Sequence, residues 1–254
     1  IHGTGVKMVP AGLRKLGFTQ IYNVPEQDVV SGDFPTVKSP NPEEPAALDL
    51  ALKKADETGA DLVMATDPDA DRVGIAVRDH HGKMVLLNGN QTVALLTYYL
   101  LSQWSEKGKL TGKEYIVKTV VTTELIADIA RAFEVPHFDV LTGFKFIADV
   151  IRKHENTHTF IGGGEESYGF MVGDFVRDKD AVTSCTMIAE IAAWAREQDK
   201  NLFDILLDIY TRFSYYKEAM LPVVRKGKEG AEEIAAMMDR FRNAAPDSLL
   251  GSDV

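Results

Sequence analysis

The stretch Asp67-Pro68-Asp69-Ala70-Asp71-Arg72 decides the fold prediction, because it separates two short apolar runs. Leu62-Val63-Met64-Ala65 precedes it, and Val73-Gly74-Ile75-Ala76-Val77 follows it. Apolar runs of this length that end at a turn are typical of buried β-strands. We therefore predict that the acidic hexapeptide is a tight loop between two strands.

Asp67, Asp69 and Asp71 place their carboxylates in one short loop, where they repel one another unless a cation lies among them. Carboxylates suit hard divalent cations, and Mg²⁺ held by a few carboxylates and a phosphate oxygen is the best match. A calcium-binding EF-hand loop is excluded, because it requires Gly at its sixth position and Glu at its twelfth. This chain has Arg72 and Arg78 at those positions.

Two other interpretations of the loop remain open. One is a solvated acidic turn that binds no metal. The other is a phosphatase of the haloacid dehalogenase type, in which Asp-x-Asp follows an apolar strand and the first aspartate, here Asp67, is the nucleophile.

The composition is that of a soluble globular protein, with 254 residues, 45% of them apolar and 26% charged. A net charge of −10 argues against nucleic acid or an anionic membrane surface as a main partner. Cys185 is the single cysteine, so no intrachain disulfide can form, and we expect a cytoplasmic location. The chain starts at Ile1 without an initiator Met, and we expect it to be a piece of a longer protein.

Helices and strands alternate along the chain. In the first part we predict helices at residues 6–16, 44–58 and 91–104, and strands at 20–24, 62–65, 73–77 and 83–87. Residues 108–112 are polar and contain glycine, which indicates a linker. In the second part we predict strands at 115–120, 137–141 and 159–162, with helices at 124–133, up to 154, up to 196, and from the cap Asn201 onward.

This pattern predicts an α/β fold: two consecutive α/β domains with mixed, mainly parallel sheets and flanking helices, plus a partial C-terminal α+β segment. The predicted bounds are residues 1–109, 110–213 and 214–254. In the last of these we expect a strand within 215–224 and a helix at 231–241.

A second polar motif, Gly163-Gly164-Glu165-Glu166-Ser167-Tyr168-Gly169, follows a predicted strand. Ligands of open α/β sheets bind at the carboxyl ends of strands. Glu165 and Ser167, two residues apart, offer a carboxylate acceptor and a hydroxyl donor that match adjacent hydroxyls of a sugar, while we expect Glu166 to face solvent. The competing interpretation is a surface turn.

Two more features carry chemistry. Lys179 lies between Asp178 and Asp180 ahead of a helix, where it could orient a phosphate, transfer a proton or simply form surface ion pairs. The turn Thr142-Gly143 opens a helix and offers either amide groups to an anion or only an N-cap.

Taken together, these motifs closely resemble the α-D-phosphohexomutase superfamily, and within it bacterial phosphoglucomutases and phosphomannomutases. The resemblance rests on the order of motifs that begin at Asp67, Gly164 and Arg177, with His2-Gly3-Thr4-Gly5 and Pro40-Asn41-Pro42-Glu43 ahead of them. It covers essentially the whole chain.

The resemblance implies a reversible transfer of phosphate between the 6- and 1-positions of a hexose, through an enzyme phosphoserine and a bisphosphorylated sugar. It implies that Asp67, Asp69 and Asp71 bind Mg²⁺ and that Arg72 lies nearby. It further implies that Lys179 is a general acid or base and that the hexose phosphate contacts four residues: Glu165, Ser167, Thr142 and Gly143. Lys118 matches the family pattern less closely, and Gly169 stands where some relatives have histidine.

Members of this superfamily have four domains, and the chain resembles the second and third, without an opening strand, and the start of the fourth. The sequence contains no Ser-His-Asn-Pro loop for a phosphoserine and no matching phosphate-binding loop. We therefore expect the chain alone to be inactive. A non-catalytic sugar-phosphate-binding module is a further alternative. For the substrate, the motif Glu165-Glu166-Ser167-Tyr168 is closer to the enzymes that act on glucose and pentose phosphates.

Overall fold

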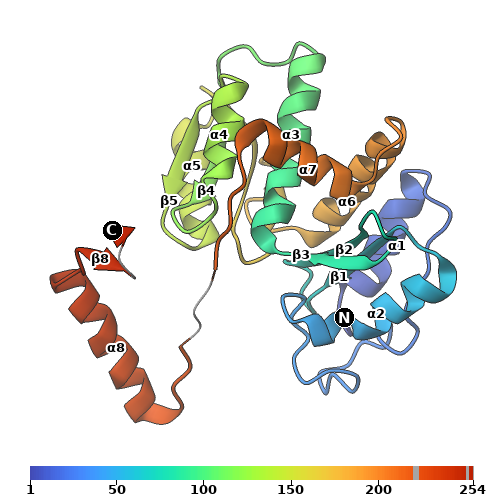
Figure 1. Cartoon of the computed structure of the whole chain (residues 1–254), viewed down its shortest axis with the longest axis horizontal. Coiled ribbons are helices and arrows are strands. Elements are labelled where there is room, and N and C mark those ends of the chain that lie inside the picture. Colours follow the sequence, from blue (N-terminus) through green and yellow to red (C-terminus); the bar gives the residue numbers. More distant parts are fainter. Residues whose placement is uncertain (220–222, 250–251, 254) are drawn as a thin grey trace. The chain divides into compact units, whose positions relative to one another are not determined.

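Two β-sheets organise residues Ile1–Tyr216 of the computed structural model, which describes residues 1–219, 223–249 and 252–253 (Figure 1). The first sheet has the order β1 (Leu62–Thr66), β2 (Val73–Arg78), β3 (Met84–Leu87). The second has the order β5 (His137–Val140), β4 (Glu114–Thr119), β6 (Thr159–Gly164), β7 (Phe170–Val172). The sheets place the acidic loop and the Gly-rich loop, which are far apart in the sequence, in one compact unit.

The two faces of the first sheet bury different side chains, because successive residues of a strand point to opposite faces. Val63 and Ala65 pack with Ala47 and Leu48 of α2 (Pro45–Thr58). On β2, Ile75 belongs to the opposite core, to which the remaining helices of this region contribute. These are α1 (Gly5–Lys15), α3 (Gly89–Glu106), α6 (Ala181–Arg196) and α7 (Leu202–Phe213).

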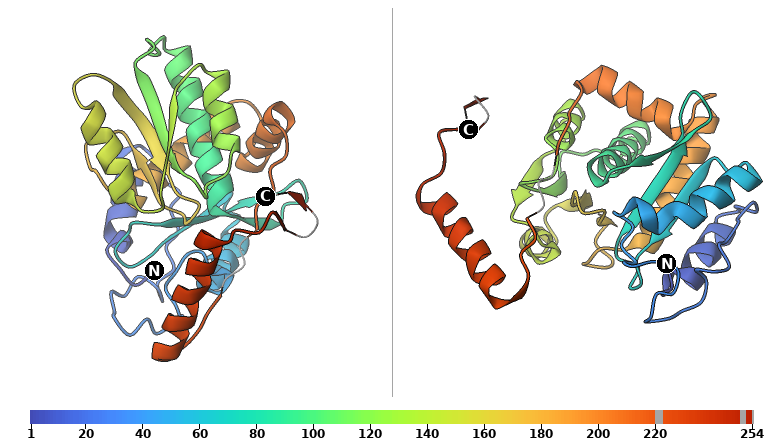
Figure 2. Two further views of the ribbon diagram at one scale, coloured as in Figure 1. Left: turned by 90° about the vertical axis from the view of Figure 1, so that its left-hand side faces the viewer. Right: turned by 60° about the horizontal axis from the view of Figure 1, so that its bottom comes forward.

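The second sheet lies between α5 (Phe144–His154) on one face and α3 with α4 (Leu125–Ala132) on the other, as Figure 2 shows. β4 pairs in parallel with both β5 and β6, while β7 is antiparallel to β6. Tyr115 and Val117 pack toward α5, whereas Ile116 joins the core on the α3 side. The carboxyl ends of β4, β5 and β6 therefore meet at one edge of the sheet.

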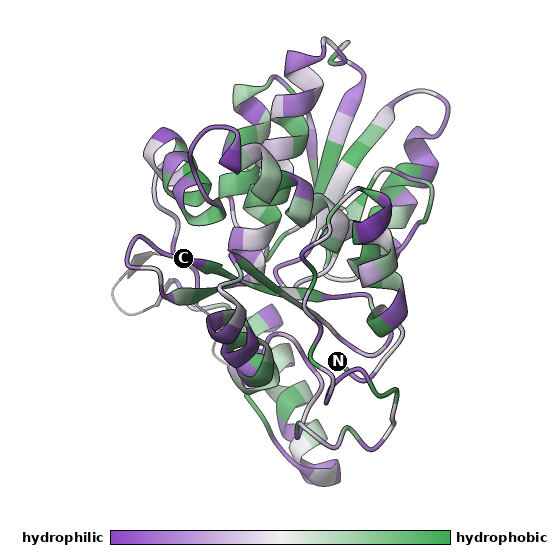
Figure 3. Cartoon of the chain, turned by 90° about the vertical axis from the view of Figure 1, so that its right-hand side faces the viewer, coloured by the Kyte–Doolittle hydropathy of each residue, from purple (hydrophilic) through white to green (hydrophobic). Residues whose placement is uncertain are grey.

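One hydrophobic core connects the two sheets. It includes Ile75 of the first sheet, Ile116 of the second and the long helix α3, whose Leu96 and Leu101 are fully buried. Figure 3 shows hydrophobic residues gathered on the strands of the first sheet. This shared core explains why residues 1–216 form one unit. Among the described residues, no helix has the length and hydropathy that a membrane span requires.

The predicted α/β class and most elements are confirmed, and the second sheet is mixed and mainly parallel as expected. The predicted cap Asn201 accepts a hydrogen bond from the amide of Asp204 at 3.0 Å. The first sheet differs from the expectation, since all its described pairs are antiparallel. A hexapeptide loop and a hairpin connect its strands, and parallel neighbours would need long crossovers.

Two predicted strands are not present in the described residues. Residues 20–24 have a strand-like sequence but no ladder partner in the structure. Of the strand expected within 215–224, residues 220–222 lie outside the described residues, and the rest is not strand. The predicted bound between residues 109 and 110 stays a prediction.

Residues Lys217–Val254 form a separate unit. It contains α8 (Gly227–Asn243), which includes the predicted helix at 231–241, and the short strands β8 (Ser248–Leu249) and β9 (Ser252–Asp253). Within α8, all of which the structure describes, Gly230 alone is buried.

Glu114 organises the loop that leads into β4. Its carboxylate accepts hydrogen bonds from the amides of Thr111, Gly112 and Lys113 and from the Thr111 hydroxyl, at 2.7–3.1 Å. Burial by itself raises the pKa of Glu114, but these donors outweigh it and hold the pKa below its ordinary value of 4.5.

The stability that the Glu114 carboxylate contributes is predicted to depend on pH. Because the folded pKa is lowered, this stability is present above the unfolded pKa and is lost as pH falls through the folded pKa. Glu114→Gln is expected to lower the free energy of unfolding by about 1 kcal/mol at pH 7, with a smaller difference in strong acid. Urea denaturation at several pH values measures this, and a difference that grows toward low pH would contradict it.

Candidate active site

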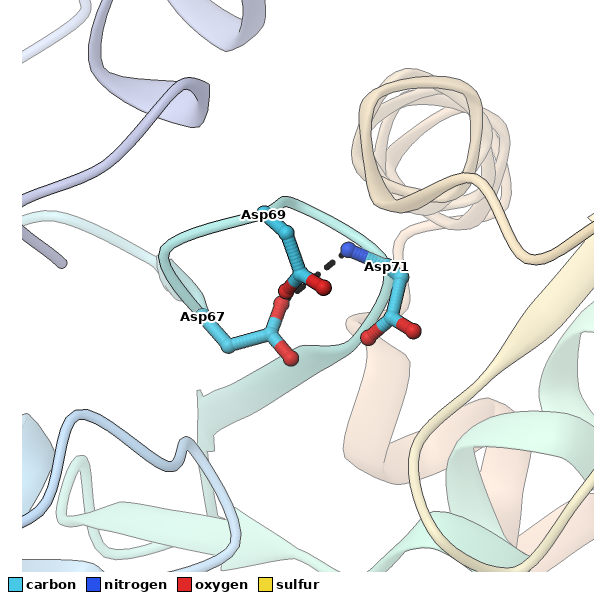
Figure 4. A group of neighbouring side chains, drawn as sticks. All are labelled: Asp67, Asp69 and Asp71. Carbon is cyan, nitrogen blue, oxygen red and sulfur yellow. Dashed lines mark hydrogen bonds between the residues drawn. The ribbon is translucent and has the colours of Figure 1, made fainter.

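The acidic loop is closed by its own first side chain. The amides of Asp71 and Arg72 both donate to Oδ1 of Asp67 at 3.0 Å, and Figure 4 shows the first of these bonds. The amide of Ala70 donates to the Asp67 carbonyl at 3.1 Å, and Ala70 takes a φ of 57°, in the left-handed region that favours glycine. The loop therefore holds a strained backbone that gathers its acids, as functional sites often do.

The three aspartates converge as predicted. One carboxylate oxygen from each of Asp67, Asp69 and Asp71 lies within 4.8 Å of the others. Burial, followed by the neighbouring Asp71 and Asp69, raises the pKa of Asp67 to about 6. A cation would stabilise the ionised carboxylates against both their desolvation and their mutual repulsion. The donor set therefore fits a hard divalent ion such as Mg²⁺.

Two cations border the triad. Nζ of Lys179 lies 2.8 Å from Oδ2 of Asp71, and Nε of Arg72 lies 3.7 Å from both Asp67 and Asp71. Burial alone would lower the pKa of Lys179, but the hydrogen bond to Asp71 and the negative charges of the neighbouring carboxylates together outweigh burial, so the pKa is raised. Oε1 of Glu43 accepts a hydrogen bond from Nη1 of Arg72 at 3.0 Å, which fixes the guanidinium.

Backbone contacts from distant segments hold the acidic loop in place. The Thr4 amide donates to the Pro68 carbonyl at 2.8 Å, and the Ala181 amide at the start of α6 donates to the Ala70 carbonyl at 2.9 Å. A Cβ on Gly3 would lie 2.1 Å from the Pro68 carbonyl oxygen, so only glycine allows this approach. These contacts explain why His2-Gly3-Thr4-Gly5 belongs to the site.

The Gly-rich loop at the end of β6 is tied to the turn before α5. Glu165 is 5% exposed, and its Oε1 accepts the Gly143 amide at 2.7 Å. The structure thus brings Glu165 and Gly143 together. Ser167 is half-buried and Thr142 is exposed, and neither side chain hydrogen-bonds to another described residue.

The two loops meet. The Val73 amide, just after the acidic loop, donates to the Tyr168 carbonyl at 3.1 Å. Lys179 joins them: its ammonium contacts Asp71, and a Cβ on Gly169 would lie 2.3 Å from its Cδ. The charge of Glu165 also contributes to the raised pKa of Lys179. Lys179 therefore contacts the acidic triad and lies close enough to Glu165 to respond to its charge.

Comparison with known proteins decides the family. The family model for "Phosphoglucomutase/phosphomannomutase, alpha/beta/alpha domain II" matches residues 1–82. The model for "alpha/beta/alpha domain III" of the same family matches residues 88–213. The chain belongs to the phosphoglucomutase/phosphomannomutase family. The family assignment made from the motifs is thereby confirmed.

Similar proteins agree with this membership. The chain is 37% identical to a phosphoglucomutase of Staphylococcus haemolyticus and 39% identical to one of Staphylococcus aureus strain USA300, over all 254 residues. It covers 46% and 45% of those proteins, so it spans about half the length of the curated relatives it matches. A crystal structure of a family protein from Burkholderia thailandensis shares the fold, with a TM-score of 0.63 and 19% identity over 82% of this chain and 41% of that one.

Three charged residues of this family member have surroundings that were not predicted. Lys118 is fully buried at the end of β4, with Nζ 2.6 Å from Glu124 and 3.1 Å from Asp139. Glu166 was expected to face solvent, but it is half-buried, and the hydroxyls of Thr119 and Thr122 donate hydrogen bonds to it at 3.1 and 3.0 Å. The third is Glu43, the partner of Arg72. Lys118 itself, a charged residue within the predicted strand 115–120, was the one sequence feature that could have indicated a buried charge here.

Proposed function

We propose that this chain supplies the metal-binding and sugar-binding parts of a cytoplasmic phosphohexomutase. The longer protein would move phosphate between the 6- and 1-positions of a hexose, through an enzyme phosphoserine and a bisphosphorylated intermediate. The observation that carries the proposal is the contact of Lys179 with Asp71, which joins the acidic triad to the loop of Glu165.

The acidic loop would hold the metal. Asp67, Asp69 and Asp71 are the ligands, and Mg²⁺ bound there supplies positive charge that offsets the charge of a phosphoryl group in transfer. Arg72, fixed by Glu43, adds a permanent positive charge at the rim of the same loop.

The Gly-rich loop would orient the sugar. Oε1 of Glu165 is occupied by the Gly143 amide, which leaves Oε2 to accept sugar hydroxyls. Ser167 and Thr142 add hydroxyls that have no partner among the described side chains. Lys179, between the sugar loop and the triad, would hold or deliver the proton of the hydroxyl that exchanges phosphate.

The experiment is a comparison of two proteins. The purified chain is expected to give no measurable conversion of glucose 1-phosphate to glucose 6-phosphate, whereas the longer protein converts it. Comparing kcat/KM for glucose, mannose, glucosamine and pentose phosphates would define the substrate, with glucose or pentose expected to be preferred. Phosphate release by the chain alone, with a trapped phosphate on Asp67, would instead favour the phosphatase. Sugar-phosphate binding without turnover by the longer protein would favour a non-catalytic module.

Gly169→Ala is predicted to reduce activity without unfolding the protein. The new Cβ would lie 2.3 Å from Cδ of Lys179, and this flexible side chain can move away from Asp71 more easily than backbone can shift. In the longer protein kcat/KM is expected to fall about 100-fold, because small displacements of a catalytic group are costly. Steady-state kinetics and urea denaturation separate the two effects, and an unchanged kcat/KM would contradict the role of Lys179.

A further inference from the structure

Glu166 lies in the Gly-rich loop but has no role in the proposed function. It is half-buried, and its Oε2 accepts hydrogen bonds from the hydroxyls of Thr119 at 3.1 Å and Thr122 at 3.0 Å. These threonines belong to a turn of residues 119–123 at the carboxyl end of β4, which we call the threonine turn. The two hydrogen bonds therefore join the Gly-rich loop to a segment that is more than 40 residues away in the chain.

The two threonine hydroxyls need an acceptor beside them. Thr119 is 0% exposed and Thr122 is 2% exposed, and their hydroxyl oxygens lie 2.7 Å apart. Each hydroxyl has one hydrogen, so one can donate to the other, and the remaining hydrogen needs a further acceptor. Oε2 of Glu166 supplies it. Without an acceptor at position 166, a buried hydroxyl would lose its partner, which is energetically unfavourable.

Other contacts hold the threonine turn in place. The Thr122 amide donates to the Thr119 carbonyl at 3.0 Å, and the Thr123 amide donates to Oδ1 of Asn90, on α3, at 3.0 Å. Nζ of the fully buried Lys118 donates to the Thr122 carbonyl at 3.3 Å. The threonine turn is therefore a firmly held support to which the Gly-rich loop is attached.

Two neighbouring glutamates fix the Gly-rich loop in different directions. Oε1 of Glu165 accepts the Gly143 amide before α5 at 2.7 Å, whereas Glu166 bonds to the threonine turn. The Glu165 amide also donates to the Gly169 carbonyl at 2.9 Å, which closes the loop. A Cβ on Gly89, at the start of α3, would lie 1.8 Å from the Glu166 carbonyl oxygen, so the loop backbone packs closely on α3. The place of Glu165 therefore depends on the residue next to it.

We infer, on the basis of the proposed function, that Glu166 is a positioning residue for the sugar-binding carboxylate of Glu165. The bonds from Thr119 and Thr122 hold the Gly-rich loop at the carboxyl end of β4, and this keeps Glu165 beside the Gly143 amide. Glu166 acts by accepting hydrogen bonds rather than by its charge. A neutral acceptor of the same shape at this position is therefore expected to have the same effect.

The first measurement needs no catalysis. The Gly143 amide is bonded to Glu165, so its hydrogen exchange in the chain reports the place of that carboxylate. Glu166→Met removes both carboxylate oxygens and is expected to speed this exchange at least about tenfold, whereas Glu166→Gln still accepts from both hydroxyls and should change it less than about threefold. Unchanged exchange in the methionine variant would overturn the inference. Equal acceleration by methionine and glutamine would overturn it too, since charge would then be what matters.

Two more variants separate positioning from a general loss of stability. Glu190→Met is the matched control: Glu190 accepts from the hydroxyl of the buried Tyr99 at 2.7 Å, and no hydrogen bond among the described residues joins it to the Gly-rich loop. It is expected to leave exchange at Gly143 unchanged, and acceleration equal to that of Glu166→Met would overturn the inference. Thr122→Val removes one donor with little change of shape and is expected to speed exchange about threefold. No change in that variant would also overturn the inference.

The second measurement is steady-state kinetics of the longer protein with glucose 1-phosphate. A displaced Glu165 weakens sugar binding in the ground state and the transition state alike, so Glu166→Met is expected to raise KM about tenfold and to lower kcat less than about threefold. Glu166→Gln should keep KM within about threefold of the unaltered value. A loss confined to kcat would overturn the inference. An unaltered longer protein without mutase activity would instead contradict the proposed function, and exchange at Gly143 would still decide whether Glu166 positions Glu165.

Discussion

Replacement of Lys179 by methionine in the longer protein is expected to lower kcat/KM about 1000-fold. The ammonium lies 2.8 Å from Asp71 and 5.1 Å from the Phe144 ring, close to the loop of Glu165, so methionine removes a charge and a proton at the centre of the site. Methionine keeps most of the apolar stem, which limits the effect on folding. Steady-state kinetics measures the loss.

Two further variants separate proton transfer from charge. Lys179→Arg keeps the positive charge beside Asp71 but does not readily lose a proton, so it is expected to restore substrate binding without restoring kcat. Lys200→Met removes a surface ion pair with Asp208 and should leave kcat/KM unchanged. Full activity of Lys179→Met would exclude Lys179 from the chemistry.

Gly3→Ala is expected to destabilise the protein strongly. The new Cβ would lie 2.1 Å from the carbonyl oxygen and 2.2 Å from Cα of Pro68. Both are backbone atoms, so the acidic loop must shift, and the free energy of unfolding is expected to fall by about 3 kcal/mol.

The matched control is Gly32→Ala. A methyl group added at Gly32 would meet no heavy atom within 4 Å, and Gly32 has no left-handed φ, so alanine should change stability by less than about 0.5 kcal/mol. Chemical denaturation of both variants measures the difference. If the two alanines cost the same, the close approach of Gly3 to the acidic loop does not hold in solution.

The sequence predicted the features that depend on residues close together in the chain. Asp67, Asp69 and Asp71 are adjacent in one loop, so their convergence needed only the two flanking strands. The second sheet was predictable for the same reason, because its strands alternate regularly with helices.

The contacts that the sequence did not predict join residues that are distant in the chain. Glu43 and Arg72 are 29 residues apart, and Glu166 reaches Thr119 across 47 residues, so no local pattern indicated either contact. Residues 20–24 have the pattern of a strand, but a strand forms only where a neighbour supplies hydrogen bonds. The left-handed Ala70 was equally hidden, since alanine carries no signal of a positive φ.

The most direct measurement is divalent cation binding by the chain itself, because the proposed function rests on the acidic triad. Titration with Mn²⁺, followed by electron paramagnetic resonance and by competition with Mg²⁺, is expected to detect one site per chain. Asp69→Asn should weaken that site at least about tenfold, whereas Asp79→Asn, in the hairpin between β2 and β3, should not. Equal affinity of Asp69→Asn and the unaltered chain would contradict a metal site at the triad.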